Sequence, residues 1–321
     1  LRDMSKILVT GGTGFVGSNL ILQLLHEKNE IISFDNNSRN SFSNDLLLDN
    51  NVRLIEGDIT NPNDLKKIPN DIDIVYHLAA INGTKYFYDI PEKVLQVNLK
   101  GTLNLMEWIL STDTKRIFFS SSSEVYGFPT IFPTPESSIL SVPDSTNPRF
   151  SYSSSKITGE IIIINFAKSL GIDYTIARLH NAYGPKMGFE HVIPEFIRKA
   201  VNEEKFLVNG DGTESRSFCY VSDIVKEIEL ITSGSNGKNE IFNIGNSVET
   251  TINQLITELE QIHGKKISPV YTKFDNPGTK RRVPDLSKIK KLGYLPKISL
   301  HDGLEKTYQW YENYYKNDPH S

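Results

Sequence analysis

The glycine-rich run TGGTGFVG constrains the fold more strongly than any other part of this chain. It follows an apolar, β-branched segment at residues 6–10 and opens a helical segment at residues 14–28. Glycines let the backbone approach a pyrophosphate, and the N-terminus of the following helix offers free N–H groups to that anion. A glycine turn between a strand and a helix therefore predicts a dinucleotide-binding βαβ unit built on Gly11, Gly14 and Gly17. The alternative is a turn whose glycines have packing roles only.

Short apolar segments continue to alternate with helical ones through the first half of the chain. Residues 31–34, 53–56, 73–78, 116–120 and 174–179 favour strands, and residues 94–110 and 152–170 favour helices. Near-continuous apolar strands separated by helices indicate a parallel sheet that is covered on both faces. We expect an α/β fold in which residues 1–180 form a doubly wound (Rossmann) sheet.

Beyond residue 180 the pattern changes to shorter elements that are interrupted by glycine and proline. Helical segments are expected at residues 194–202, 222–230 and 251–263. We expect residues 181–321 to form a smaller C-terminal α/β domain that binds the substrate. Some of its segments should cross back to the first sheet, for example around residues 240–244.

Composition limits the classes of function. The net charge of −4 argues against a nucleic-acid partner, because such proteins usually present a basic patch. No apolar run is long enough to span a membrane, and the first residues lack the apolar core of a signal peptide. We therefore expect a cytoplasmic protein, with Met4 as the candidate initiator. The single cysteine, Cys219, allows no internal disulfide and no cysteine-based metal cluster, and no metal site is expected.

Two acidic positions indicate how a dinucleotide would be bound. Asp35 ends the second predicted strand, 18 residues after Gly17, where a carboxylate can accept hydrogen bonds from the adenosine ribose and repel a 2′-phosphate. This position favours NAD over NADP, although Arg39 nearby is of a type that can hold that phosphate. Asp58 and Ile59 follow the third strand, where they either flank the adenine or begin a helix as an N-cap.

Reactive side chains follow later in the chain. The run FSSSSEVYG begins at the buried end of a predicted strand, and YSSSK places Tyr152 and Lys156 four residues apart on one face of a helix. A tyrosine has an ordinary pKa near ~10, which a neighbouring ammonium and a cationic nicotinamide both lower. Tyr152 can therefore act as a general base near neutral pH.

These motifs resemble the extended short-chain dehydrogenase/reductase family, in the branch that modifies nucleotide sugars. The resemblance extends over nearly the whole chain through TGGTGFVG, GDI, HLAA, SSSSEVYG, YSSSK, NAYGP and SRSFCYVSDI. It implies that Tyr152 is the base, that Ser122 hydrogen-bonds the reacting sugar oxygen, and that Lys156 steers Tyr152 and holds the nicotinamide ribose. The further NAD contacts that it implies are Phe15, Val16, Leu78, Ala79, Ala80 and Asn98.

The resemblance also implies how the nucleotide sugar is held. Asn181 matches a contact to the diphosphate, and Arg216 and Arg282 match arginines that clamp its two phosphates, a task that suits the planar guanidinium fork. Arg281 could take the place of Arg282, because the arginine is doubled. The N-terminus of a helix near His191 and Val192 would point at the same anion. Lys85 and Ser123 complete the expected substrate contacts.

Glu124 bears on the reaction that follows oxidation at C4 of the sugar. At this strand end the motif of a 4,6-dehydratase resembles T-D-E, and here Ser123 stands in place of its aspartate. A UDP-glucuronate decarboxylase resembles T-S-E-V-Y-G, which SSEVYG matches closely, and RRVPD also looks like that group. A 4-epimerase usually carries a small or neutral residue at this position. Glu124 could equally be a carboxylate that shapes the pocket.

Other segments depart from the decarboxylase pattern. INGTKYFYD, at residues 81–89, departs from it. MGFEHVIP is also different and resembles instead an assortment of bacterial capsule and lipopolysaccharide epimerase and dehydrogenase sequences. The first prediction is therefore NAD-dependent oxidation at C4 by a 4-epimerase or 4-dehydrogenase, with GDP-heptose modification as one example. A UDP-glucuronate decarboxylase ranks second and a 4,6-dehydratase third. UDP, GDP and dTDP sugars all remain open as substrates.

Two further hypotheses concern loss of activity and assembly. The alternative to an enzyme is a regulator that binds NAD without catalysing a reaction. The intact set of Ser122, Tyr152 and Lys156 argues against it. The helix at residues 152–170 contains four consecutive isoleucines, and the helix at 94–110 carries apolar residues at helical spacing: Leu95, Leu99, Leu103 and Met106. These two helices predict a homodimer through a four-helix interface. The alternative is that the chain's own second domain buries them.

Overall fold

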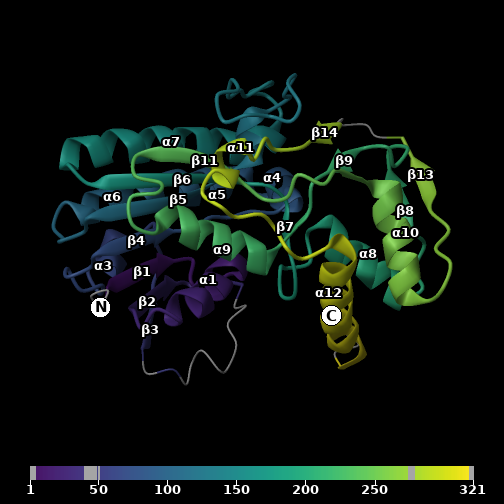
Figure 1. The fold of residues 1–321 in the computed structure, drawn as a ribbon, viewed down its shortest axis with the longest axis horizontal. Helices are drawn as coiled ribbons and strands as arrows, with labels where there is room; N and C mark the ends of the chain where they lie inside the picture. Colours follow the sequence, from purple (N-terminus) through teal and green to yellow (C-terminus); the bar gives the residue numbers. More distant parts are fainter. Residues whose placement is uncertain (1–4, 40–48, 50, 274–278, 318–321) are drawn as a thin grey trace.

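The computed structural model describes residues 5–39, 49, 51–273 and 279–317, so Met4 lies outside the described residues. Its centre is a parallel sheet of seven strands in the order β11-β6-β5-β4-β1-β2-β3 (Figure 1). The order reverses between β1 and β4, which makes this a doubly wound sheet. The strands are β1 (Lys6–Thr10), β2 (Glu30–Asp35), β3 (Val52–Glu56), β4 (Ile74–His77), β5 (Arg116–Ser122), β6 (Asp173–Leu179) and β11 (Glu240–Ile244).

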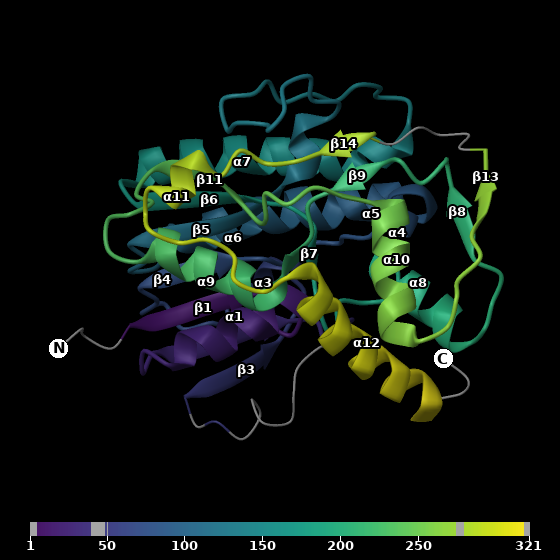
Figure 2. The same ribbon diagram turned by 45° about the vertical axis from the view of Figure 1, so that its right-hand side comes forward.

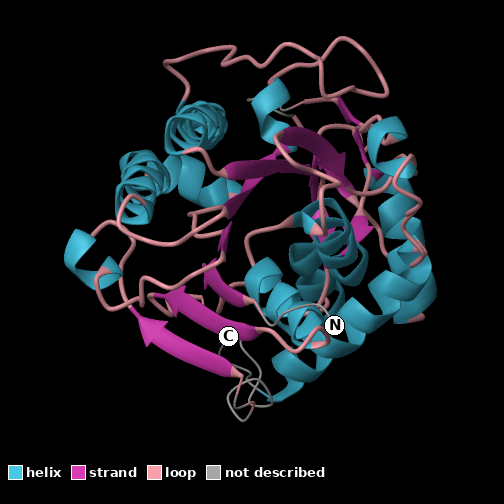
Figure 3. Cartoon of the chain, turned by 60° about the vertical axis from the view of Figure 1, so that its left-hand side comes forward, coloured by secondary structure: helices cyan, strands magenta, loops and turns pink. Residues whose placement is uncertain are grey.

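Helices cover both faces of this sheet, as Figure 3 shows from the side. One face is covered by α1 (Phe15–Leu25), α9 (Val221–Thr232) and α11 (Ser287–Lys290). The other face is covered by α3 (Pro62–Leu65), α6 (Gly101–Ile109) and α7 (Ser151–Leu170). Because both faces are covered, the strands are apolar along most of their length.

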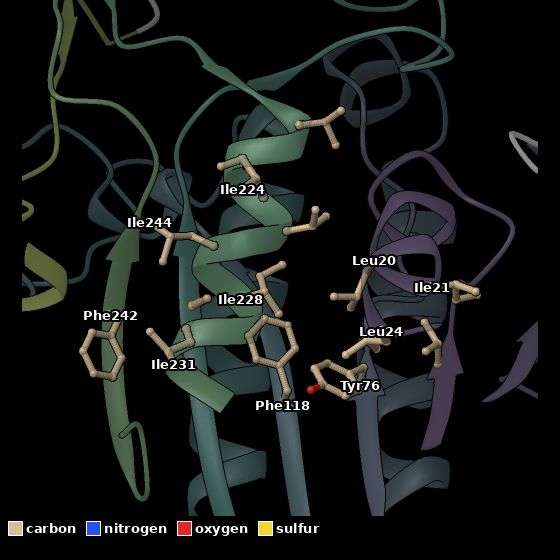
Figure 4. Close-up of a cluster of buried hydrophobic side chains, with 14 of the residues drawn as sticks. Leu20, Ile21, Leu24, Tyr76, Phe118, Ile224, Ile228, Ile231, Phe242 and Ile244 are labelled. Carbon is tan, nitrogen blue, oxygen red and sulfur yellow. The ribbon is translucent and has the colours of Figure 1, made fainter. Parts of the chain in front are cut away.

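The core on the α1 and α9 face shows how distant segments meet. Ile224, Ile228 and Ile231 of α9 pack against Phe118 of β5 and Phe242 of β11, and Leu20, Ile21 and Leu24 of α1 lie beside them (Figure 4). β11 thus joins the sheet next to β6, although about 60 residues of the second half separate them. Residues after 180 therefore belong partly to the first sheet.

The remaining C-terminal elements form a second body beside the carboxyl ends of the strands, on the right of Figure 1. Its helices α8 (Val192–Val201), α10 (Ile252–His263) and α12 (Leu300–Asn317) lie next to one another (Figure 2), and their apolar side chains share one core. Its short strands pair as β10-β7, β12-β9-β14 and β13-β8. They are β7 (Ala182–Tyr183), β8 (Leu207–Asn209), β9 (Ser215–Arg216), β10 (Cys219–Tyr220), β12 (Thr250–Thr251), β13 (Val270–Thr272) and β14 (Arg281–Arg282).

Some elements differ from those expected. The helix predicted at residues 94–110 is a longer composite of α5 (Pro91–Leu95), a π-helical turn at Gln96–Lys100 and α6. Met106 is fully buried in the core, so it cannot belong to an exposed interface stripe. Neither α4 (Thr84–Asp89) nor α12 was predicted. Among the described residues, no helix is both long enough and apolar enough to cross a membrane.

Candidate active site

A cavity of about 860 Å³ lies at the carboxyl ends of the sheet strands, between the sheet and the C-terminal body. Ligands of doubly wound sheets bind at this edge. Of the residues predicted to contact cofactor or substrate, all line the cavity except Asn98 and Lys85. The predicted catalytic residues also line this cavity: Ser122, Glu124, Tyr152 and Lys156.

The glycine turn forms one end of the cavity. Gly11 has a φ of +72°, and a Cβ there would lie 2.7 Å from the backbone nitrogen of Ala79. A Cβ on Gly17 would overlap the carbonyl oxygen of Gly11. Only glycine fits at both positions, so the turn leaves the N-terminus of α1 open to the cavity, with Phe15 and Val16 in its wall. A dinucleotide pyrophosphate fits this cradle.

Asp35, the last residue of β2, and Asp58, which follows β3, lie at the same end. The Asp35 carboxylate accepts hydrogen bonds from the backbone of Thr13 (3.1 Å) and Asn37 (2.9 Å), which fix it beside the glycine turn. Asp58 accepts from the backbone and hydroxyl of Thr60, each at 2.8 Å. The helix that follows is capped by Asn61, so Asp58 is not its N-cap. Ile59 lines the cavity next to Asp58.

The middle of the cavity brings Ser122 and Tyr152 together with Lys156. Ser122 ends β5, and Tyr152 and Lys156 lie on one face of α7. The Lys156 ammonium donates to the carbonyl of Ser120 at 2.7 Å, and its Nζ lies 5.8 Å from the centre of the Tyr152 ring. The Tyr152 ring also stacks on Phe87 of α4, with 4.8 Å between ring centres.

Burial shifts the pKa of both reactive groups toward their neutral forms. It raises the pKa of Tyr152 well above its ordinary value, although the adjacent Ser122 hydroxyl lowers it. It lowers the pKa of Lys156 to about 7, and the nearby Glu160 carboxylate opposes this shift. Lys156 therefore changes its protonation state near neutral pH, beside the tyrosine predicted to be the base.

Glu124 is ion-paired in the same wall. Its Oε1 accepts from Nη1 of Arg282 at 2.5 Å, and the Arg282 side chain is only 6% exposed. Burial raises the pKa of Glu124, but the charges of Arg282, Arg149 and Arg216 outweigh burial and the net shift is downward. The backbone N–H of Glu124 also donates to the Ser122 hydroxyl. Glu124 is thus a carboxylate that stays ionised two residues from Ser122.

Cationic and polar groups line the rest of the cavity. Arg282 faces it, whereas Arg281 points outward into a two-pronged pair with Glu249, with distances of 2.7 and 2.8 Å. Burial lowers the pKa of Arg216 to about 10, with Arg282 contributing, which still leaves Arg216 charged at neutral pH. Asn181 and Ser123 also contribute to the lining.

The N-terminus of α8 opens into the same cavity. His191 occupies its N-cap position and Val192 begins the helix, and both line the cavity. Burial, with a smaller contribution from Arg39, lowers the pKa of His191 to about 4. His191 is therefore neutral in the physiological range, and any contact it makes with a ligand is a hydrogen bond rather than an ion pair.

The two predicted residues outside the lining each contact a residue that lines the cavity. Asn98 is buried; it accepts from the backbone N–H of Ile81 at 2.9 Å and donates to Ser155 Oγ at 3.0 Å. It therefore holds Ile81, which does line the cavity, against α7. Lys85 is 60% exposed and pairs with Glu190 at 3.7 Å.

Several lining residues were not found from the sequence, among them Phe87, Arg149 and Glu190. Arg149 lies three residues before Tyr152, but nothing in its local sequence distinguishes it from a surface arginine. Phe87 belongs to α4, which was not predicted. Among the described residues, no group of three or more His, Cys, Asp or Glu side chains is arranged to hold a metal ion.

Known proteins resemble this chain over most of its length. The model of the NAD dependent epimerase/dehydratase family matches residues 7–245. UDP-glucuronic acid decarboxylase 3 of Arabidopsis thaliana is 34% identical over 305 residues, which cover 93% of this chain and 86% of that protein.

Solved structures also resemble nearly the whole chain, two 4-epimerases among them. The UDP-glucose 4-epimerase of Thermotoga maritima, solved with UDP-glucose, superposes with a TM-score of 0.85 at 32% identity and covers 96% of this chain and 99% of its own. The UDP-glucuronic acid 4-epimerase of Bacillus cereus, solved with UDP-glucuronic acid and NAD, superposes with a TM-score of 0.88 at 29% identity and covers 97% of this chain and 100% of its own.

Proposed function

The chain belongs to the NAD-dependent epimerase/dehydratase family, and on this premise we propose that it oxidises C4 of a nucleotide-diphosphate sugar. NAD is the cofactor, and the glycine turn with Asp35 fits its pyrophosphate and adenosine ribose. When bound, NAD supplies the hydride acceptor and a positive charge at the nicotinamide. The observation that carries the proposal is that Ser122, Tyr152 and Lys156 line the same cavity as that turn, Arg216 and Arg282.

The chain's own residues would handle the proton at C4. Ser122 ends β5 and can hydrogen-bond the sugar hydroxyl, while Tyr152 takes its proton. Because burial disfavours a phenolate, Tyr152 depends on the neighbouring Lys156 for positive charge. Phe87 stacks on the Tyr152 ring and keeps it from turning away.

For the step after oxidation, we favour a 4-epimerase or 4-dehydrogenase. Glu124 is held ionised by Arg282, so it is poorly suited to donate a proton. Ser123 stands where a 4,6-dehydratase would need an acid, which ranks dehydration below the other outcomes. Because Glu124 is held as a carboxylate by its ion pair, the proton transfers fall to Ser122, Tyr152 and Lys156.

Decarboxylation of a UDP-glucuronate is the second candidate, and one observation favours it. The pair of Glu124 and Arg282 lies in the cavity wall beside Ser122, where a carboxylate on the sugar would need a cationic partner. Relatives that act as UDP-glucuronic acid decarboxylases support the same possibility. Arg282 would then exchange Glu124 for the carboxylate of the substrate.

Turnover of a panel of UDP, GDP and dTDP sugars, with products identified by mass, tests these proposals. We expect a C4 epimer or a 4-keto sugar with NADH, and stoichiometric CO₂ from UDP-glucuronate would instead establish decarboxylation.

In Tyr152→Phe, turnover should fall at least about a hundredfold while NAD still binds, because the ring is kept and the base is lost. Turnover above about a tenth of wild type in that variant would refute Tyr152 as the base. Binding of NAD without any turnover would identify a non-catalytic NAD-binding protein.

A further inference from the structure

The motif MGFEHVIP forms one wall of the cavity. Residues 187–191, here called the 187–191 loop, are the last part of the connection between β7 and α8. Met187, Glu190 and His191 of this loop line the cavity, and the Met187 side chain is buried. Phe189 is 43% exposed and is absent from the lining. The loop therefore has an inner side, which faces the cavity, and an outer side.

The outer side is held by the aromatic face of α12. The hydroxyl of Tyr311, which is fully buried, donates to the carbonyl oxygen of Gly188 at 2.7 Å. The ring of Phe189 lies among three tyrosine rings of the same helix, with centre-to-centre distances of 5.8 Å to Tyr311, 5.2 Å to Tyr314 and 6.2 Å to Tyr315. Hydrogen bond and ring contacts thus act on two adjacent residues of the loop.

The inner side reaches the opposite half of the molecule. Glu190 pairs with Lys85 of α4 at 3.7 Å. A Cβ on Gly188 would lie 3.9 Å from the Arg39 guanidinium, which follows β2 and also lines the cavity. The loop therefore spans from the C-terminal body to the nucleotide-binding half, and α12 is the element that holds its outer side.

We propose that Phe189 and Tyr311 are positioning residues that hold the 187–191 loop in its substrate-binding form. The proposal rests on the proposed function, because it assigns the loop to the nucleotide-sugar part of the cavity. A loop that is already ordered binds its ligand without the entropic cost of being immobilised. Loosening the loop should therefore weaken binding of the nucleotide sugar and leave the NAD end and the proton-transfer residues unchanged.

Tyr311→Phe tests the hydrogen bond, and Tyr308→Phe is its matched control. Tyr308 lies on the same helix, and its hydroxyl contacts His263 Nδ1 at 2.8 Å, away from the loop. We expect Tyr311→Phe to raise KM for the nucleotide sugar about twofold to tenfold, as loss of one hydrogen bond does, with kcat and the Kd for NAD unchanged. Phe189→Ala, at a half-exposed position, should raise KM similarly. Tyr308→Phe should leave KM unchanged.

Hydrogen–deuterium exchange separates failure of this inference from failure of the proposed function. In Tyr311→Phe, amides of residues 187–191 should exchange faster than in wild type, whereas in Tyr308→Phe they should not. Equal exchange in the two variants, or an equal KM, would overturn the positioning role. If the wild-type protein turned over no nucleotide sugar, the proposed function would fail, and the exchange data would still decide whether α12 holds the loop.

Discussion

At the scale of single residues, Lys156 links the chemistry to stability. Burial lowers its pKa from 10.5 to about 7, so between these values the unfolded chain binds a proton that the folded chain does not. The free energy of unfolding contributed by this group therefore rises with pH from about 7 to about 10, and it is lost as pH falls through 7. Urea unfolding of the NAD-free protein and of Lys156→Met should show a stability difference that grows in favour of wild type over that range. A constant difference would contradict the pKa shift.

Glu124 is the second residue whose replacement is informative. Glu124→Gln keeps the shape, removes the charge and leaves Arg282 without its carboxylate. If Ser122, Tyr152 and Lys156 carry the reaction, we expect a loss of about 1–2 kcal/mol of binding or positioning energy, or roughly tenfold in turnover. The assay should follow NADH and CO₂ together. A loss of more than about a thousandfold, with CO₂ as a wild-type product, would instead identify Glu124 as a participant in decarboxylation.

Site residues could be predicted from the sequence where the chemistry is local. The glycines precede a helix, and Tyr152 and Lys156 are one helical turn apart, so spacing alone brings them together. The partner of Glu124 is 158 residues away in the chain, and only the fold shows that Arg282, not Arg281, reaches it. Arg149 carried no local signal, and only the fold shows that it lines the cavity.

At the scale of elements, one buried ion pair connects α7 to the sheet. Glu160 of α7 and Arg178 of β6 are 3% and 4% exposed, with Nη2–Oε2 at 2.8 Å and Nε–Oε1 at 3.0 Å. Ser121, beside Ser122, also donates to Glu160. Glu160→Gln should lower the free energy of unfolding by about 3–5 kcal/mol, because a buried charge then loses its partner.

A surface pair supplies the control for that measurement. Lys288 and Glu240 are 35% and 52% exposed, with Nζ–Oε2 at 2.6 Å. Glu240→Gln should cost no more than about 1 kcal/mol in urea unfolding, since solvent screens an exposed pair. Comparable losses in the two variants would mean that the Glu160 pair does not act as a buried one.

Strands were easier to predict than the short helices. β1 has the predicted bounds, and the other predicted strands differ by one or two residues at their ends, because short apolar runs between turns leave few alternatives. The π-helical turn at Gln96–Lys100 has no such pattern. α12 is rich in aromatic and charged residues, and it is a helix because its tyrosines find a core formed by α8 and α10.

At the scale of the whole molecule, the cavity depends on both halves. The glycine turn and Tyr152 come from the first half, whereas Arg216, Arg282 and the 187–191 loop come from the second. The sequence predicts each set separately, but not their facing geometry, because the contacts between them join residues more than a hundred positions apart. The return of β11 to the sheet and of β14 to the cavity wall is what makes the two halves one site.

Assembly is the last prediction at this scale. α6 and α7 are in contact on one face of the sheet, and each exposes a large apolar side chain: Leu103 is 37% exposed and Ile161 is 56% exposed. Apolar surface on adjacent helices favours burial against a second copy at about 25 cal/mol per Å². We expect a homodimer through these helices, with twice the chain mass in sedimentation at micromolar concentration. Ile161→Glu should shift the protein to monomer, because a charge would enter the interface. Ile139→Glu, in a loop outside these helices and 86% exposed, should remain a dimer. A wild-type protein that sediments as a monomer would refute this interface.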